Sequence, residues 1–173
     1  HDYKFNNHRP DKKKAHQEDW RRVERKKFFK RKFIIEGDLT SNKEFMLQLI
    51  LKDPFTFIDA SNTLKGDKEV VLAAVEQDGL LLEEASPELK NDDDVVYIAV
   101  KQNGMALEFA SDRLKSDIDI AKTAVKQDIN AIRDIDNSLK QDEELRQIVF
   151  EKNHYLAKLF LKMTDNEIEK RRN

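Results

Sequence analysis

DKEVVLAAVEQDGLLLEEASPELKND, residues 67–92, decides the fold because the chain repeats its pattern every 25 residues. The step is clearest at a Leu-Lys pair and at an aspartate. These recur as Leu64-Lys65, Leu89-Lys90, Leu114-Lys115 and Leu139-Lys140, and as Asp67, Asp92, Asp117 and Asp142. Self-similarity at a fixed period of this size is the signature of a stacked repeat. Degenerate copies begin at Leu39 and run to about Met163.

Each unit predicts two short helices, and each helix starts at a residue suited to cap it. The first helix starts at Asn42, Asp67, Asp92, Asp117 or Asp142, and the second at Asp53, Asp78, Asn103, Asp128 or Asn153. The side-chain oxygen of Asp or Asn accepts hydrogen bonds from the unpaired N–H groups of a first helical turn. An acid two positions after the first cap suits the positive end of the helix dipole. We expect Ser61, Ser86 and Ser111 to close the second helix.

Apolar columns indicate which faces of these helices are buried. In the first helix they are Val70, Val95, Ile120 and Leu145; Ala74, Ala99, Ala124 and Val149; and Val75, Val100, Val125 and Phe150. In the second they are Phe57, Leu82, Leu107, Ile132 and Ala157, then Ala60, Ala85, Ala110, Ile135 and Phe160, with the four leucines filling the connection. Helices this short are marginal alone, so neighbouring units must cover them. The sequence therefore predicts an all-α helical repeat solenoid of short helix pairs.

Composition narrows the class of protein further. Hydrophobic residues make up 39% and charged residues 38% of the 173 residues, which suits an elongated array better than one globular core. The chain contains no cysteine, which excludes disulfides, thiolate metal sites and a cysteine nucleophile. No apolar run approaches the roughly 18 residues of a membrane span. We expect an intracellular protein, cytoplasmic or organellar (mitochondrial included). Because the first residue is His, we also expect a fragment or a processed product.

Charge divides the chain into a basic arm and an acidic body. Residues 1–33 carry 13 Lys or Arg against 5 Asp or Glu, a net charge of +8, and the remainder carries 19 against 29, a net charge of −10. We therefore expect residues 1–33 to form a basic arm with a helix over 16–33, residues 34–165 to form the repeat domain, and residues 166–173 to form a charged tail. The helix and the tail are placed to cap the ends of the array.

The arm holds the best candidate contact residues. They are Lys12, Lys13, Lys14, Trp20, Arg21, Arg22, Arg25, Lys26, Lys27, Lys30, Arg31 and Lys32, with Phe28 and Phe29 interleaved. Basic side chains neutralise phosphates, and aromatic rings stack on unpaired bases. The same composition also suits an acidic protein or an acidic membrane surface. A plain alternative is a solvated helix whose aromatic residues cap the solenoid.

A second candidate is the column Lys65, Lys90, Lys115 and Lys140, which would follow one edge of the solenoid. It suits an acidic partner or a phosphate backbone, or simply a solvated stripe paired with nearby acids. No catalytic residue, metal site or cofactor site is expected. The histidines do not stand at metal-ligand spacing, the glycines belong to no phosphate loop, and Ser86 and Ser111 lack a paired histidine.

The repeat columns resemble the family of short helical repeats known as domain of unknown function 4116, whose pattern looks like D-x-E-V-V-x-x-A-V-x-x-x-G-x-A-L-x-x-A-S-x-x-L-K-x-D. Residues 67–92 match at Asp67, Glu69, Val70, Val71, Ala74, Val75, Gly79, Leu82, Ala85, Ser86, Leu89, Lys90 and Asp92, and residues 92–117 match in the same way. The next copy departs from the pattern at Ile129 and Asp136. The resemblance covers roughly residues 39–163 and implies an all-helical array that binds partners, with no catalytic residue.

Two functions remain open at this point, and neither is enzymatic. The first is a non-catalytic interaction or scaffold subunit of a larger assembly, with one or more protein partners. The alternative is an RNA-contacting accessory subunit of a ribonucleoprotein, such as an organellar ribosome, that uses residues 1–33.

Overall fold

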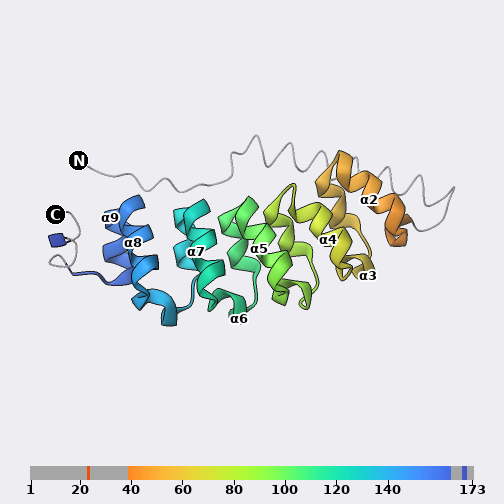
Figure 1. Cartoon of the computed structure of the whole chain (residues 1–173). Helices are drawn as coiled ribbons and strands as arrows, with labels where there is room; N and C mark the ends of the chain where they lie inside the picture. Colours follow the sequence, from red (N-terminus) through yellow and green to blue (C-terminus); the bar gives the residue numbers. More distant parts are fainter. Residues whose placement is uncertain (1–22, 24–38, 165–168, 171–173) are drawn as a thin grey trace.

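The chain folds into a row of stacked helical units. The structure, a computed structural model, describes Val23, residues 39–164 and residues 169–170. Every regular element within 39–164 is a helix, and the helices follow one another along a line from α2 to α9 (Figure 1). We number the units 1 to 5 from their first residues, which are Asn42, Asp67, Asp92, Asp117 and Asp142. The all-α repeat fold and its 25-residue period are confirmed.

The first helices of the units form one row of the stack, and each helix contacts the next. They are α2 (Lys43–Lys52), α4 (Lys68–Val75), α5 (Asp93–Gln102), α7 (Ile118–Gln127) and α8 (Glu143–Lys152). Each starts at the predicted Asp or Asn, whose side chain accepts a hydrogen bond from an N–H of the first turn. The capping prediction is therefore confirmed for the first row.

The second row consists mostly of 3₁₀-helices. Its members are η2 (Pro54–Asp59), η3 (Gly79–Glu84), η5 (Gly104–Phe109), η6 (Ile129–Arg133) and the α-helix α9 (His154–Leu161). The predicted Asp and Asn caps are again confirmed, since each side chain accepts from an N–H of its helix. The tight 3₁₀ geometry suits segments of five or six residues. Three of them end at Ala60, Ala85 and Ala110, where the backbone becomes extended.

The expectation that serines close the second helix is wrong. The hydroxyl oxygens of Ser61, Ser86 and Ser111 instead accept hydrogen bonds, each 3.4 Å long, from the N–H groups of the leucines three residues further on. They therefore introduce a third short helix, which the prediction of two helices per unit missed. The three that follow these serines are α3 (Asn62–Lys65), η4 (Leu89–Asn91) and α6 (Asp112–Lys115). Asp136 caps the fourth, η7 (Asn137–Gln141), and a further 3₁₀ turn, η1 (Leu39–Ser41), precedes unit 1.

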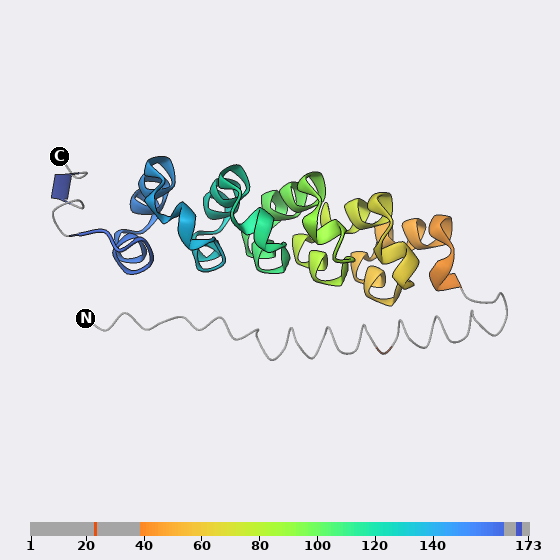
Figure 2. The ribbon, with the colours of Figure 1, turned by 90° about the horizontal axis from the view of Figure 1, so that it is seen from below.

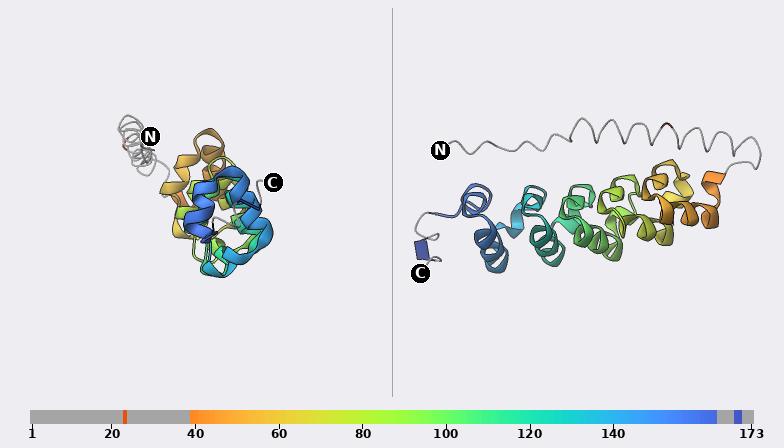
Figure 3. Two further views of the ribbon diagram at one scale, coloured as in Figure 1. Left: turned by 90° about the vertical axis from the view of Figure 1, so that its left-hand side faces the viewer. Right: turned by 90° about the horizontal axis from the view of Figure 1, so that it is seen from above.

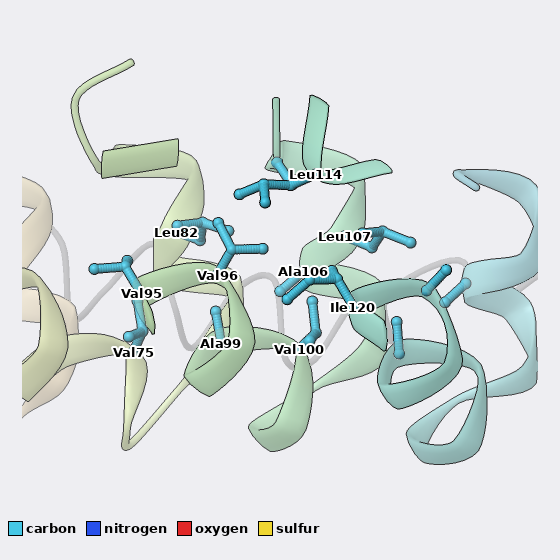
Figure 4. Packing of buried hydrophobic residues seen from close by; sticks show 14 of the residues in the cluster. Val75, Leu82, Val95, Val96, Ala99, Val100, Ala106, Leu107, Leu114 and Ile120 are labelled. Carbon is cyan, nitrogen blue, oxygen red and sulfur yellow. The ribbon is translucent and has the colours of Figure 1, made fainter. Parts of the chain in front are cut away.

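The core is a continuous apolar layer between successive units. The predicted columns are buried, except that Leu139 and Phe160 are half-buried. Figure 4 shows side chains of neighbouring units meeting there, with Val75 close to Val95 and Leu82 close to Val96. Phe160 is less covered because no described unit packs beyond α9, and the Arg133 guanidinium lies 6.0 Å from the centre of its ring.

A glutamine in the last turn of the first helix fastens unit 3 to unit 2 and unit 4 to unit 3. The Gln102 side chain accepts a hydrogen bond from the Gly79 N–H (2.6 Å) and donates one to the Gln77 carbonyl (3.0 Å). Gln127 repeats both bonds one unit later, with the Gly104 N–H (2.5 Å) and the Gln102 carbonyl (3.2 Å). These bridges hold the C-terminal ends of the first helices in register.

A backbone hydrogen bond also fastens three of the four junctions. The N–H groups of Ser86, Ser111 and Asp136 donate to the carbonyls of Lys65, Lys90 and Lys115, at 2.9, 2.9 and 3.0 Å. Seen from below, the two rows of helices lie side by side (Figure 2), and seen along the row the units overlap (Figure 3). The result is a narrow rod with long exposed edges.

Candidate interaction surface

The predicted contact residues of the basic arm lie outside the described residues. This applies to Lys12, Lys13, Lys14, Trp20, Arg21, Arg22, Arg25, Lys26, Lys27, Lys30, Arg31 and Lys32. The predicted capping role of residues 16–33 stays a prediction for the same reason. Of that segment only Val23 is described, as a helical residue whose surface is 40% exposed.

The lysine column at the ends of the third helices is partly enclosed by its own repeat. Lys65, Lys90, Lys115 and Lys140 are all half-buried. The Lys65 ammonium lies 2.6 Å from a carboxylate oxygen of Glu84 in the next unit. Three of the four backbone carbonyls also accept the junction bonds described above. The sequence interpretation assigned these positions no structural role, whereas their backbones and the Lys65 side chain help to join the units.

A ladder of lysines and carboxylates, which sequence reasoning missed, follows the edge where the first helices begin. Lys43 reaches from unit 1 to both Asp67 and Glu69 of unit 2, at 2.8 Å each. Lys68 reaches from unit 2 to Asp92 (2.9 Å) and Asp94 (2.7 Å) of unit 3. Each ammonium therefore bridges a carboxylate pair, formed by the capping residue and the acid two positions later.

In each of the capping residues Asp67 and Asp92, one carboxylate oxygen caps the helix and the other binds a lysine of the preceding unit. In Asp67, Oδ1 accepts from the N–H groups of Glu69 and Val70, while Oδ2 accepts from Lys43. In Asp92, Oδ1 caps the helix and Oδ2 binds Lys68. The hydrogen bond from Lys43 lowers the pKa of Asp67, and the hydrogen bonds that Lys43 donates to Asp67 and Glu69 raise the pKa of Lys43. Both groups are thus held in their charged forms.

The same arrangement appears between units 4 and 5, although the lysine comes from another position. Ile118 stands where Lys43 and Lys68 stand in their units, and Lys122, one helical turn later, supplies the cation. Its ammonium lies 3.4 Å from Asp142 and 2.5 Å from Glu144. The carboxylate pair is therefore bridged from a second direction.

Between units 3 and 4 the ladder is interrupted. Asp93 takes the place of Lys43 and Lys68, and Tyr97 takes the place of Lys122. The carboxylates of Asp117 and Asp119 consequently form no ion pair with any described residue. Tyr97 remains 44% exposed. We call this set, consisting of Asp93, Tyr97, Asp117 and Asp119, the open junction.

Arg113 supplies one cation to the open junction, where it is bound to Asp93. Its guanidinium donates to the Asp93 carboxylate at 2.8 and 3.2 Å and to the Asn91 carbonyl at 2.7 Å. The hydrogen bonds from Arg113 lower the pKa of Asp93. Three carboxylates and one guanidinium leave the open junction with a net charge of −2.

Neither a metal site nor a membrane span is found in the described part of the chain. Within that part no group of three or more His, Asp or Glu side chains could hold a metal ion. No helix there is both long and apolar enough to cross a bilayer.

These features define a helical-repeat protein built from 25-residue units. The family model "Domain of unknown function (DUF4116)" matches three times in tandem, at residues 42–90, 67–115 and 92–140. The three matches together cover more than half of the chain, so the chain belongs to this family. The resemblance noted from the sequence is confirmed. Comparison with curated proteins and with solved structures gave no match.

Proposed function

We propose that the chain is a non-catalytic scaffold that binds protein partners along the exposed edges of its rod. The observation that supports this is how the repeated residues are used. The recurring Asp, Asn and Ser side chains cap helices, the recurring apolar residues fill the core, and the recurring Gln and Gly join the units. Stacked repeats of this kind present extended surfaces for binding. The surface residues that vary between units are left to recognise partners.

Affinity purification of the full chain from its native cells, with bound proteins and RNA both identified, tests this proposal. A scaffold is expected to copurify with defined proteins in fixed stoichiometry. Turnover of a substrate that a single substitution abolishes would contradict the non-catalytic role, and so would purification of the chain without any protein partner. The proposal places the chain inside the cell, in the cytoplasm or an organelle, which agrees with its lack of cysteine.

A second candidate function follows from the segregation of charge in the sequence. Residues 1–33 carry a net charge of +8 beside a body of −10. Phosphates would bind the arm and be repelled by the body, so an RNA-contacting subunit of a ribonucleoprotein, such as an organellar ribosome, would use the arm for RNA and the rod for protein. Such binding is expected to weaken steeply with salt.

The RNA candidate is tested by comparing the full chain with a variant that lacks residues 1–33. Loss of salt-dependent RNA binding in the shorter variant, with an unchanged helical signal in circular dichroism, would support it. Equal RNA binding by both chains would rule it out. Binding of the arm to acidic vesicles but not to RNA would favour a membrane surface instead.

A further inference from the structure

We propose that residues 16–33, the basic helical segment predicted from the sequence, dock along the second row of helices in units 1 to 3. The inference goes beyond the proposed function, because it concerns how the chain holds its own arm. A partner that needs the basic residues of this segment would first have to displace it from the rod.

The docking surface is a line of side chains on the outward side of the second row. Because a 3₁₀-helix has three residues per turn, residues three apart lie one above the other. Leu80 and Glu83 therefore share one side of η3, and Met105 and Glu108 share the same side of η5. Met105 is half-buried and the other three are exposed. With the equivalent half-buried residues of unit 1 they form a set that we call the outer stripe: Phe55, Ile58, Leu80, Glu83, Met105 and Glu108.

The outer stripe is apolar and acidic, which suits a basic segment that also carries aromatic residues. Glu84 beside it is paired with Lys65, whereas Glu83 and Glu108 form no ion pair with any described residue. Long basic side chains lie over apolar surface while their charged ends reach outward. Residues 16–33 supply both kinds of group, with 8 Lys or Arg against 3 Asp or Glu, and with the apolar residues Trp20, Val23, Phe28, Phe29 and Phe33.

The outer stripe ends where the charge of the row changes sign. At the position of Glu83 and Glu108, unit 4 carries Arg133 and unit 5 carries Lys158. At the position of the apolar side chain, unit 4 carries Asn130. Like charges placed opposite each other suppress binding, so a basic segment is favoured over units 1 to 3 and disfavoured over units 4 and 5.

The point where the chain enters the rod lies beside the outer stripe. The Thr40 carbonyl accepts the N–H of Ser61, two residues after η2, at 3.0 Å, and unit 1 stands at the end of the rod (Figure 1). The five residues 34–38 that precede Leu39 span up to about 17 Å. Val23, the described residue of the segment, is helical. A helix of 18 residues is about 27 Å long and neighbouring helices lie about 8–10 Å apart, so the segment reaches from unit 1 to unit 3.

The test places a nitroxide spin label on the segment of the full chain and records ¹H–¹⁵N correlation spectra. Because the chain contains no cysteine, Gln17→Cys and Arg31→Cys each provide a single attachment site. The segment folds back from unit 1, so we expect the label on Arg31→Cys to broaden the amides of η2 and the label on Gln17→Cys to broaden those of η5. Broadening confined to α2 at the end of the rod, broadening of the first row, or none in the rod at all would overturn the proposal.

A mixing experiment separates docking within one chain from docking onto a second copy. Spin-labelled Gln17→Cys chain without ¹⁵N is mixed with an equal amount of ¹⁵N-labelled chain that carries no spin label. We expect no broadening in this mixture, because each segment docks on its own rod. Broadening of η5 in the mixture would assign the segment to a second copy and would overturn the proposal.

Charge reversal on the outer stripe separates docking from folding. Glu83→Lys combined with Glu108→Lys is expected to lower the equilibrium constant for docking about 2- to 30-fold, as the loss of two exposed ion pairs implies, and to weaken the broadening of η3 and η5. The matched control, Glu76→Lys combined with Glu151→Lys, makes the same charge change at exposed positions of the first row and is expected to leave the broadening nearly unchanged. Circular dichroism checks that both variants stay folded. Equal broadening in the two double variants would refute the site, and the scaffold function, which copurification tests separately, would stand.

Discussion

Substitution of Gly104 by alanine is expected to destabilise the rod by about 2 kcal/mol. A Cβ built on Gly104 would collide with the carbonyl oxygen of Ala124 in the next unit and would lie 2.9 Å from the Asp128 nitrogen. Neither atom is free to move, because this carbonyl accepts the N–H of Asp128 at 2.8 Å at the end of α7. Overpacking of this kind costs about 1–3 kcal/mol, which outweighs the gain of about 0.4–1 kcal/mol from stiffening the unfolded chain.

Gly66 supplies the matched control. Its φ of −100° is open to any residue, and the nearest atoms to an added Cβ lie at 3.5 and 3.7 Å, which is ordinary contact. Gly66→Ala is therefore expected to leave stability unchanged or to raise it by about 0.4–1 kcal/mol. The two variants make the same chemical change, and only the contact across the junction differs.

Urea unfolding at pH 7, followed by far-ultraviolet circular dichroism, measures both effects. In a chain of this length a loss of 1 kcal/mol corresponds to a fall of about 2–4 °C in the melting temperature, so thermal melts provide a second reading. If Gly104→Ala were as stable as the natural chain, or if Gly66→Ala lost as much as Gly104→Ala, the explanation by close approach of neighbouring units would be refuted.

Three further predictions concern polar contacts. Gln102→Ala is expected to lower the free energy of unfolding by about 1–3 kcal/mol and to speed hydrogen exchange of the Gly79 amide, because this buried N–H loses its acceptor. Unchanged exchange at Gly79 would contradict this. The hydrogen bond from Lys43 lowers the pKa of Asp67, so the charged carboxylate stabilises the folded state above the unfolded pKa of about 4, and this stabilisation disappears as the pH falls through the folded pKa. The difference in unfolding free energy between the natural chain and Asp67→Asn should therefore narrow between pH 7 and pH 3 in urea titrations. Burial and the nearby Glu108 raise the pKa of Asp134, so ionisation of this carboxyl group destabilises the folded state as the pH rises. Asp134→Asn should therefore raise the free energy of unfolding at pH 7 and leave it unchanged at pH 3. A variant with a lower free energy of unfolding at pH 7 would refute this.

The helix starts and the buried faces were predictable because each depends on residues within one unit, and the period was predictable because successive units keep these residues at the same spacing. An Asp or Asn before an apolar face signals a cap wherever it stands, and spacing along a single helix identifies the buried face. The role of Ser86 was misread because a serine suits the end of one short segment and the start of the next. Only the structure shows the backbone becoming extended at Ala85, one residue earlier.

Contacts between units were not predictable from the columns taken one at a time. Gln102 and Gly79 are 23 residues apart, and neither looks unusual alone. Compared across units, however, the two positions change together. The two glycines are each followed, one unit later, by a glutamine that binds them, whereas Ile129 is followed by Lys152 at the glutamine position.

Unit 1 shows the physical reason for this coupling. Pro54 stands at the glycine position and has no N–H to donate, and Gln77 instead donates to the Ile50 carbonyl at 2.9 Å. The glutamine therefore keeps its link to the preceding first helix even where the second link is chemically impossible. Pairs that change together in successive units of one chain thus identify the contacts that hold a repeat in register.

The same comparison separates what belongs to the repeat from what belongs to this protein. A residue that recurs at every unit is explained by stacking, because every unit needs the same caps, core and junctions. A junction that departs from the others while its carboxylate pair is kept needs a different explanation. Asp117 and Asp119 retain the pair, yet Asp93 and Tyr97 remove both known sources of its lysine. Stability alone would favour a lysine there, so the interruption is a feature of this protein and not of the repeat.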